Sequence, residues 1–138
     1  MKAYLGIGTN LGDRAANLHR AVEMINEQAG HVLACSSFME TEPWGFTSDN
    51  AFLNAVVEVD TPHTPYELLH ITQKIEREMG RAHKSINGNY TDRIIDIDIL
   101  LYGDERINEP DLIIPHPMMW QRSFVCEPLW EIAPHLKP

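Results

Sequence analysis

One segment constrains the fold of this chain more than any other: residues 93–101, which read Arg-Ile-Ile-Asp-Ile-Asp-Ile-Leu-Leu. Apolar and acidic side chains alternate there with the two-residue period of a β-strand, in which successive side chains point to opposite faces of a sheet. The pattern predicts a strand over 94–102 with one face in the core. Its core side would consist of Ile95, Ile97, Ile99 and Leu101.

The alternation places Asp96 and Asp98 together on the opposite face, with Cα atoms roughly 6–7 Å apart. Two adjacent carboxylates repel each other, and a cation between them relieves the repulsion. Mg²⁺ in proteins typically uses one or two carboxylates together with substrate phosphates. A solvated polar strand face is the alternative interpretation, but Ile94 and Leu100 share that face and argue against simple exposure. We therefore favour a metal site on this strand.

Helices and strands alternate along the rest of the chain. Strands are predicted near 4–7, over 31–39 and over 52–59, and short helical turns near the C-terminus. One helix is predicted from about residue 13 to Gly30, because Ala15, Leu18, Val22 and Ile25 recur there at spacings of three and four. Another, from Thr64 to about residue 79, begins with a capping box and would bury Leu68, Thr72, Ile75 and Met79. The order β-α-β-β-α-β predicts a ferredoxin-like α+β fold, an antiparallel sheet with helices packed on one face.

The strand over 52–59 also has two distinct faces. Its core side would consist of Leu53, Ala55, Val57 and Val59. Phe52 and Asn54 would share the other face, where an aromatic ring lies beside an amide that both donates and accepts hydrogen bonds. A planar heterocycle with amide-like edges would suit such a face. An ordinary core aromatic beside a loop is the alternative.

Length and charge exclude several classes of protein. The 138 residues predict one domain over 1–138, and the net charge of −9 argues against a general nucleic-acid-binding role. No stretch approaches about 18 apolar residues, and no secretory signal precedes the first strand, so we expect a cytoplasmic protein. The window 71–95 nevertheless contains five basic and three acidic side chains. It could hold a polyanion or be merely a basic helix surface.

A histidine, an arginine and a phenylalanine near the C-terminus form a further candidate group. A proline on each side of His116 stiffens the backbone there, which suits a hydrogen bond to phosphate or ribose. Arg122 could clamp phosphate, and Phe124 could stack on a planar ligand. A structural histidine, a surface charge and a core aromatic are the plainer alternatives. Elsewhere, the turn containing Gly6 and Gly8 lacks the third glycine of a dinucleotide-binding loop.

These stretches resemble the 6-hydroxymethyl-7,8-dihydropterin pyrophosphokinases of the folate pathway over essentially the whole sequence. The matching segments are Gly8-Thr9-Asn10-Leu11-Gly12-Asp13, Phe52-Leu53-Asn54-Ala55, Gln73-x-x-Glu76-x-x-x-Gly80-Arg81, Arg93-x-x-Asp96-x-Asp98-Ile99, Pro115-His116-Pro117 and Arg122-x-Phe124-Val125-x-x-Pro128-Leu129-x-Glu131-Ile132-Ala133-Pro134. Each segment is weakly specific alone, but the set in this order and spacing is highly specific.

The resemblance implies an enzyme that transfers pyrophosphate from ATP to the hydroxymethyl group of the pterin and releases AMP, on a fold with long substrate loops. It implies two Mg²⁺ ions held by Asp96 and Asp98, which would be catalytic together with Arg81 and Arg93. The ATP-binding residues would be Gln73, Glu76, Arg81, Lys84, Arg93, Ile99, His116 and Arg122. The pterin-binding residues would be Gly8, Thr41, Pro43, Trp44, Phe52, Asn54 and Phe124. We expect small-molecule substrates, no nucleic-acid or membrane partner, and a monomer.

The chain departs from the family pattern in three places. His83 stands where a second arginine is usual, Tyr90 lies in the loop where a tryptophan is usual, and the chain stops at Pro138 where many relatives continue. Two other functions remain open on the residues alone. One is a metal-dependent phosphohydrolase that uses the same two aspartates, and the other is a non-catalytic ligand-binding module of the same fold.

Overall fold

The strands and helices follow one another along the chain in the predicted order. The computed structural model describes residues 1–41, 51–80 and 94–138, so the loop expected over 81–92 lies outside the described residues. The strands are β1 (Lys2–Thr9), β2 (His31–Cys35), β3 (Met39–Thr41), β4 (Phe52–Asp60), β5 (Asp96–Tyr102), β6 (Ile107–Glu109) and β7 (Leu112–Ile114). The helices are α1 (Arg14–Gln28), α2 (Pro65–Glu78) and α3 (Ser123–Ile132), with short turns of 3-10 helix at η2 (Met119–Gln121) and η3 (Pro134–Leu136).

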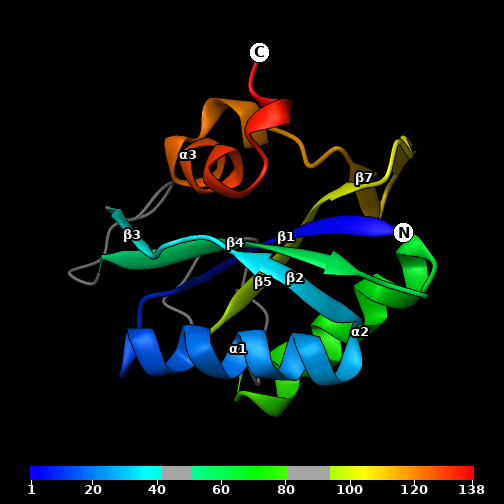
Figure 1. Ribbon diagram of the computed structural model, residues 1–138. Helices are drawn as coiled ribbons and strands as arrows, with labels where there is room; N and C mark the ends of the chain where they lie inside the picture. The colour runs from blue at the N-terminus through cyan, green and yellow to red at the C-terminus, as the bar shows by residue number, and fades with distance from the viewer. Residues whose placement is uncertain (42–50, 81–93) are drawn as a thin grey trace.

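The main sheet is antiparallel, with the strand order β2-β4-β1-β5, and β3 pairs with the start of β4. Figure 1 shows α1 and α2 on one side of this sheet and α3 on the other. We call the face toward α1 and α2 the lower face and the face toward α3 the upper face. The predicted ferredoxin-like α+β fold is confirmed. The two helices of that pattern, α1 and α2, pack on one face as predicted, and the additional helix α3 covers part of the upper face.

Each face of the sheet has its own hydrophobic core. The lower core lies against α1 and α2 and includes the residues of β4 that the alternation over 52–59 assigns to the core. The upper core lies under α3 and is smaller. Its buried members are Tyr4, Val56, Leu100, Met119, Val125, Leu129 and Ala133. The two faces of β4 are therefore as predicted, with Val56 on the opposite side from its neighbours.

One position of β5 lies on the opposite face from the one predicted. The pairing of β5 with β1 shifts by one residue between Ile99 and Leu101, so that Leu100 is an extra residue that forms a β-bulge. The bulge reverses the alternation, and Leu101 packs against the upper core while Tyr102 reaches the lower core. The predicted placement of Leu101 beside Ile99 is therefore wrong. The three isoleucines before the bulge lie in the lower core as predicted.

Both predicted helix starts are confirmed, by the cap at Asp13 and by the complete capping box of α2. The residues predicted to be buried in α2 are buried, except that Met79 is half-buried at the C-cap. In α1 the buried residues are Leu18, Ala21, Met24 and Ile25. Of the four apolar positions that predicted this helix, Leu18 and Ile25 are therefore buried. Val22 is half-buried against the lower core and Ala15, at the start of the helix, is exposed. Within the described part of the chain, no helix is both long and apolar enough to cross a membrane.

The strand predicted over 31–39 is interrupted at Ser36 and Ser37. The hydroxyl of Ser36 accepts a hydrogen bond from the backbone N of Val56 at 2.9 Å, in place of a backbone carbonyl. The backbone N of Ser37 turns away from β4 and donates to Oε2 of Glu131 in α3 at 2.6 Å. The edge of the sheet therefore consists of two short strands, and the connection between them is attached to α3.

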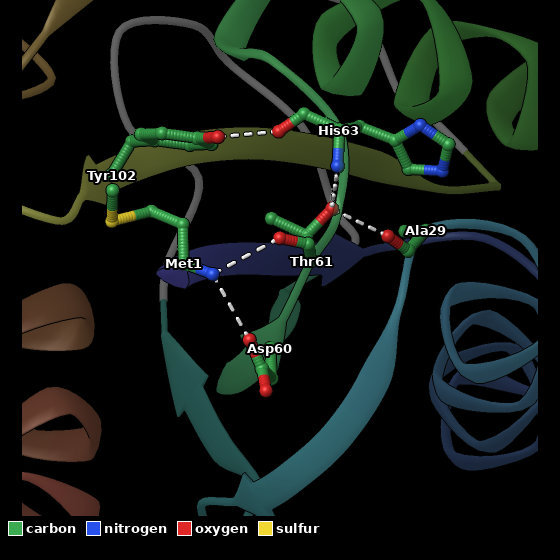
Figure 2. A network of polar contacts seen from close by, with 6 residues as sticks. All are labelled: Met1, Ala29, Asp60, Thr61, His63 and Tyr102. Atoms are coloured by element: carbon green, nitrogen blue, oxygen red, sulfur yellow. Dashed lines mark hydrogen bonds and ion pairs between the residues drawn. The ribbon is translucent and has the colours of Figure 1, made fainter.

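The ends of α1, β1 and β4 meet in a polar network (Figure 2). The N-terminal ammonium of Met1 donates to Oδ1 of Asp60 at 3.1 Å and to the carbonyl O of Thr61 at 3.2 Å. The hydroxyl of Thr61 donates to the carbonyl O of Ala29 at 2.6 Å and accepts from the backbone N of His63 at 3.2 Å. This network stabilises one end of the sheet, and the candidate site residues lie at the other end.

Candidate active site

The aspartate pair of β5 lies beside two glycines of β1. Gly8 pairs with Asp96 and Gly6 pairs with Asp98. Because the isoleucines that alternate with the aspartates lie in the lower core, both carboxylates lie on the upper face, as predicted. Glycine has no side chain, so β1 contributes only backbone to the upper face at these positions. The side chain of Asp98 is 40% exposed and therefore accessible to a ligand.

His116 is brought to the aspartate pair by the turn that follows β7. Its backbone N donates to the carbonyl O of Leu100 at 2.9 Å, which holds the turn against β5. In the ring, Nδ1 lies 2.7 Å from the carbonyl O of Pro117 and must donate to it, because a carbonyl oxygen only accepts. Burial lowers the pKa of His116, so the ring is neutral at pH 7. Its Nε2 then carries the lone pair and lies 3.9 Å from Oδ1 of Asp98.

A second group lies across β1 from the aspartates, on β4 and β3. Asn54 pairs with Gly8, and its Nδ2 donates to Oγ1 of Thr41 at 2.9 Å and to the carbonyl O of Met39 at 3.4 Å. The amide oxygen of Asn54 lies toward β1, since a Cβ at Gly8 would be 2.8 Å from it. The same Cβ would be 3.7 Å from the ring of Phe52. Gly8 therefore leaves space that any larger residue would fill.

Arg122 and Phe124 lie at the beginning of α3, on the same side of the sheet. Arg122 is the N-cap residue, and its guanidinium carbon lies 5.7 Å from the centre of the Phe124 ring. Phe124 packs against the upper core. The positive charge of Arg122 also contributes to the lowered pKa of His116, which places the two side chains in the same electrostatic environment.

Three adjacent strands therefore hold the two groups at one level of the sheet. Asn54 on β4 pairs with Gly8 on β1, and Gly8 pairs in turn with Asp96 on β5. Neighbouring strands are about 4.8 Å apart, so about 10 Å of backbone separates Asn54 from Asp96. A ligand that contacts both must span that distance over Gly8, which a bicyclic ring with a short substituent can do.

Other predicted ATP-binding residues lie away from the upper face. Gln73 is exposed on α2. Glu76, also on α2, is buried, and its Oε2 accepts a hydrogen bond from the backbone N of Ile97 at 2.8 Å. Ile99 is 5% exposed as a whole residue and lies within the lower core.

Five predicted site residues lie outside the described residues: Pro43, Trp44, Arg81, Lys84 and Arg93. His83 and Tyr90, at which the chain departs from the family pattern, also lie there.

The aspartate pair fits a divalent cation that shares its ligands with a substrate. In residues 1–41, 51–80 and 94–138, no three or more His, Cys, Asp or Glu side chains gather as a complete metal cage. Two carboxylates on an accessible face, beside glycines that add no side chain, instead match the way Mg²⁺ binds through one or two carboxylates plus phosphate oxygens.

Sequence reasoning missed two contacts that brace the site. Nη1 of Arg14 donates to Oε1 of Glu40 and to the carbonyl O of Ala51, both at 2.9 Å, and so connects α1 to the ends of β3 and β4. The contact of Glu131 with Ser37 connects α3 to the approach to β3. No local pattern predicts either contact, because Arg14 and Glu40 are 26 residues apart and Ser37 and Glu131 are 94 apart.

Comparisons with known proteins show which family the chain is similar to. The family model described as 7,8-dihydro-6-hydroxymethylpterin-pyrophosphokinase (HPPK) matches residues 4–134. A 2-amino-4-hydroxy-6-hydroxymethyldihydropteridine pyrophosphokinase of Porphyromonas gingivalis is 53% identical over 136 residues, which cover 98% of this chain and 92% of that protein. The Bacillus subtilis protein of the same name is 42% identical over 132 residues, covering 95% of this chain and 77% of that protein.

Solved structures show the same fold. The HPPK-DHPS chain of Plasmodium falciparum superposes on 99% of this chain with a TM-score of 0.75 at 19% sequence identity. The present chain spans only 40% of that longer chain, and at this identity the likeness concerns the fold alone. The family match and the close relatives go further: this chain belongs to the 7,8-dihydro-6-hydroxymethylpterin-pyrophosphokinase family.

Proposed function

We propose that this chain transfers pyrophosphate from ATP to the hydroxymethyl group of 6-hydroxymethyl-7,8-dihydropterin in folate biosynthesis, and releases AMP. Family membership supports the reaction class, that of an ATP-dependent pyrophosphokinase. The observation that carries the proposal is the register of three adjacent strands, in which Asn54 and Asp96 both pair with Gly8. It puts a face suited to a heterocycle within one small ligand's length of a pair of carboxylates.

The aspartates serve the phosphate end of the reaction. Asp96 and Asp98 would hold two Mg²⁺ ions, which neutralise phosphate charge and orient the triphosphate for attack at the β-phosphorus. The remaining catalysis is mainly positioning and charge stabilisation, because phosphoryl-group transfer needs little covalent chemistry from the protein. Arg81 and Arg93 would contribute further positive charge to the transferring group.

His116 and Arg122 would place the nucleotide beside the metal ions. Nδ1 of His116 donates to Pro117, so the neutral ring offers Nε2 as an acceptor. An acceptor suits a ribose hydroxyl better than a phosphate oxygen, which has no proton to donate. Arg122 supplies the charge for phosphate. Gln73, Glu76, Lys84 and the backbone of Ile99 are assigned to the same nucleotide on the family resemblance.

The pterin would lie over Gly8 between two aromatic rings. Phe52 and Phe124 approach the upper face from β4 and α3, and stacking favours a flat ring between such side chains. Asn54 donates its amide N–H groups to β3, so its oxygen accepts from a ring N–H of the ligand. The Thr41 side chain and the backbone through Pro43 and Trp44 would complete this recognition.

We also propose that residues 1–138 form one pyrophosphokinase domain that acts as a cytoplasmic monomer on small molecules, without a nucleic-acid or membrane partner. The five-stranded main sheet supports the first part, since its strands come from both halves of the chain. The acidic net charge of −9 supports the absence of a nucleic-acid partner.

The test is incubation of the purified chain with ATP, Mg²⁺ and 6-hydroxymethyl-7,8-dihydropterin, with nucleotides and pterins separated by chromatography. The proposal requires AMP and pterin pyrophosphate in equal amounts. Release of ADP or phosphate independent of the pterin would instead identify a phosphohydrolase. No turnover at any Mg²⁺ concentration, with pterin binding retained, would identify a binding module.

A further inference from the structure

The strand that carries the aspartate pair is at an edge of the sheet. In the described part of the chain, β5 pairs with β1 on one side only. Backbone N–H groups along a strand point alternately to the two sides, so an edge strand directs half of them away from the sheet. The backbone N of Ile97 is one of these, because it donates to a side chain of α2 and not to β1.

The acceptor of this hydrogen bond is a buried carboxylate. Oε2 of Glu76 lies 2.8 Å from the backbone N of Ile97, and Glu76 is only 8% exposed. The other buried residues of α2 are Leu68, Thr72 and Ile75, so the helix face that carries Glu76 is otherwise nearly apolar. Burying a carboxylate there costs free energy, and a hydrogen bond to a buried backbone group offsets that cost.

Ile97 is the residue between the two aspartates. Its backbone N belongs to the peptide group that joins it to Asp96, and that group is planar. An acceptor that fixes the orientation of this plane therefore restricts the backbone from which the Asp96 carboxylate projects. Asp98 follows through the next peptide group, which begins at the Cα of Ile97. Without this bond, the outer side of β5 would lose its backbone hydrogen bond to α2 at Ile97.

We propose that Glu76 is a positioning residue, which holds the backbone between Asp96 and Asp98 so that both carboxylates can bind one group of metal ions. The inference rests on the proposed function and deepens it. It assigns the Oε2 atom of Glu76 the role of accepting a hydrogen bond from the backbone of β5. This role is additional to the contact with ATP that the family resemblance implies. Partners that orient metal ligands commonly change metal affinity 10- to 100-fold when they are removed.

Three variants separate the hydrogen bond from the charge and from packing. Glu76→Ala removes the acceptor, and Glu76→Gln keeps an acceptor oxygen without the charge. Thr72→Val alters a buried residue one turn earlier, whose hydroxyl donates to the carbonyl O of Leu69. Two readouts need neither ATP nor pterin. One is the exchange rate of the Ile97 amide relative to the Val56 amide, which donates to Ser36. The other is the Mn²⁺ concentration that half-broadens the NMR signals of Asp96 and Asp98.

Glu76→Ala is expected to speed exchange of the Ile97 amide at least about tenfold and to raise the half-broadening Mn²⁺ concentration about 10- to 100-fold. For Glu76→Gln and Thr72→Val, the Ile97 exchange rate and the half-broadening Mn²⁺ concentration should both stay within about threefold of those of the unmodified chain. Should the alanine variant not fold, Glu76→Met provides the same loss of acceptor with similar volume.

Unchanged Mn²⁺ broadening in the variant that lacks the acceptor would overturn the proposal. So would a Gln variant that keeps Ile97 protected but loses Mn²⁺ as the alanine variant does, since charge and not position would then govern the metal. The two proposals fail separately: an unmodified chain that binds Mn²⁺ at the aspartates but transfers no pyrophosphate refutes the proposed function and leaves the positioning role intact.

Discussion

Replacing Gly8 by alanine tests the geometry on which the pterin site depends. The added Cβ would be 2.8 Å from Oδ1 of Asn54, whereas ordinary contact begins at 3.4 Å, so the amide must retreat by about 0.6 Å. Neither Gly8 nor Gly6 has a positive φ, so alanine strains the backbone at neither position. The effect of the substitution is therefore the contact itself.

The amide of Asn54 has little freedom to retreat. Its Nδ2 donates to Thr41 and to the backbone of Met39, and the side chain is buried. Loss of one such buried hydrogen bond costs about 1–3 kcal/mol, and overpacking costs a similar amount. We expect Gly8→Ala to lower the free energy of unfolding by about 1–3 kcal/mol. Because 1.4 kcal/mol is a factor of ten, we expect pterin affinity to fall about tenfold or more.

Urea denaturation measures the first quantity and calorimetric titration with the pterin measures the second. Gly6→Ala is the matched control, because the atoms nearest to a Cβ there are side-chain carbons of Leu100 at 3.5–3.6 Å, which is ordinary contact, and neither quantity should change by much. In a chain that also carries Asn54→Ala, the stability cost of Gly8→Ala should nearly disappear. Full pterin affinity in Gly8→Ala, or a stability cost that persists without the Asn54 amide, would refute the reasoning.

Three further predictions test other parts of the molecule. Asp98→Ala should lower kcat about 100-fold or more while calorimetry finds pterin affinity nearly unchanged, because the metal-bound charge matters most in the transition state; near-native turnover would remove the metal assignment. Hydrogen bonds from Ser37 hold the pKa of Glu131 below its usual 4.5, so the carboxylate stabilises the fold above that pH and the benefit is lost as pH falls through the lowered pKa. Glu131→Gln should therefore cost about 0.5 kcal/mol at pH 7 and nothing in strong acid, by urea denaturation at each pH; a pH-independent cost would contradict this. Thr64→Ala should lower the urea-derived stability by about 1 kcal/mol through loss of the capping box, with kcat retained, and no loss would show that the box adds nothing.

The local patterns predicted what local physics determines. The capping box at Thr64 and the alternation through Ile97 depend on neighbours in sequence, and both are confirmed. The face on which Leu101 lies could not be predicted locally, because the bulge at Leu100 arises from the register with β1, about a hundred residues away in the chain. The period of a single strand carries no information on that register.

The site was predictable as a set of residues and not as an arrangement. Asp96 and Asp98 follow from one strand's periodicity, and Asn54 from another's. That Gly8 lies between them depends on the strand order β4-β1-β5, which no single segment encodes. The same holds for the contact of Glu76 with Ile97, since a glutamate on a helix gives no indication of which backbone group it will meet.

The partial cover of the upper face by α3 has a practical consequence. Among the described residues, α3 covers Val56 and Leu100 of the upper core. The next upper-face positions, toward the end of the sheet away from Met1 and Asp60, carry Asn54, Gly8 and the aspartates. Bound substrates would thus complete the layer that the helix leaves open. A ligand at 100 times its Kd adds about 2.7 kcal/mol to the free energy of unfolding. At about 3–4 °C per kcal/mol, it raises the melting temperature by about 10 °C, so competitive inhibitors could be found by thermal-shift screening alone.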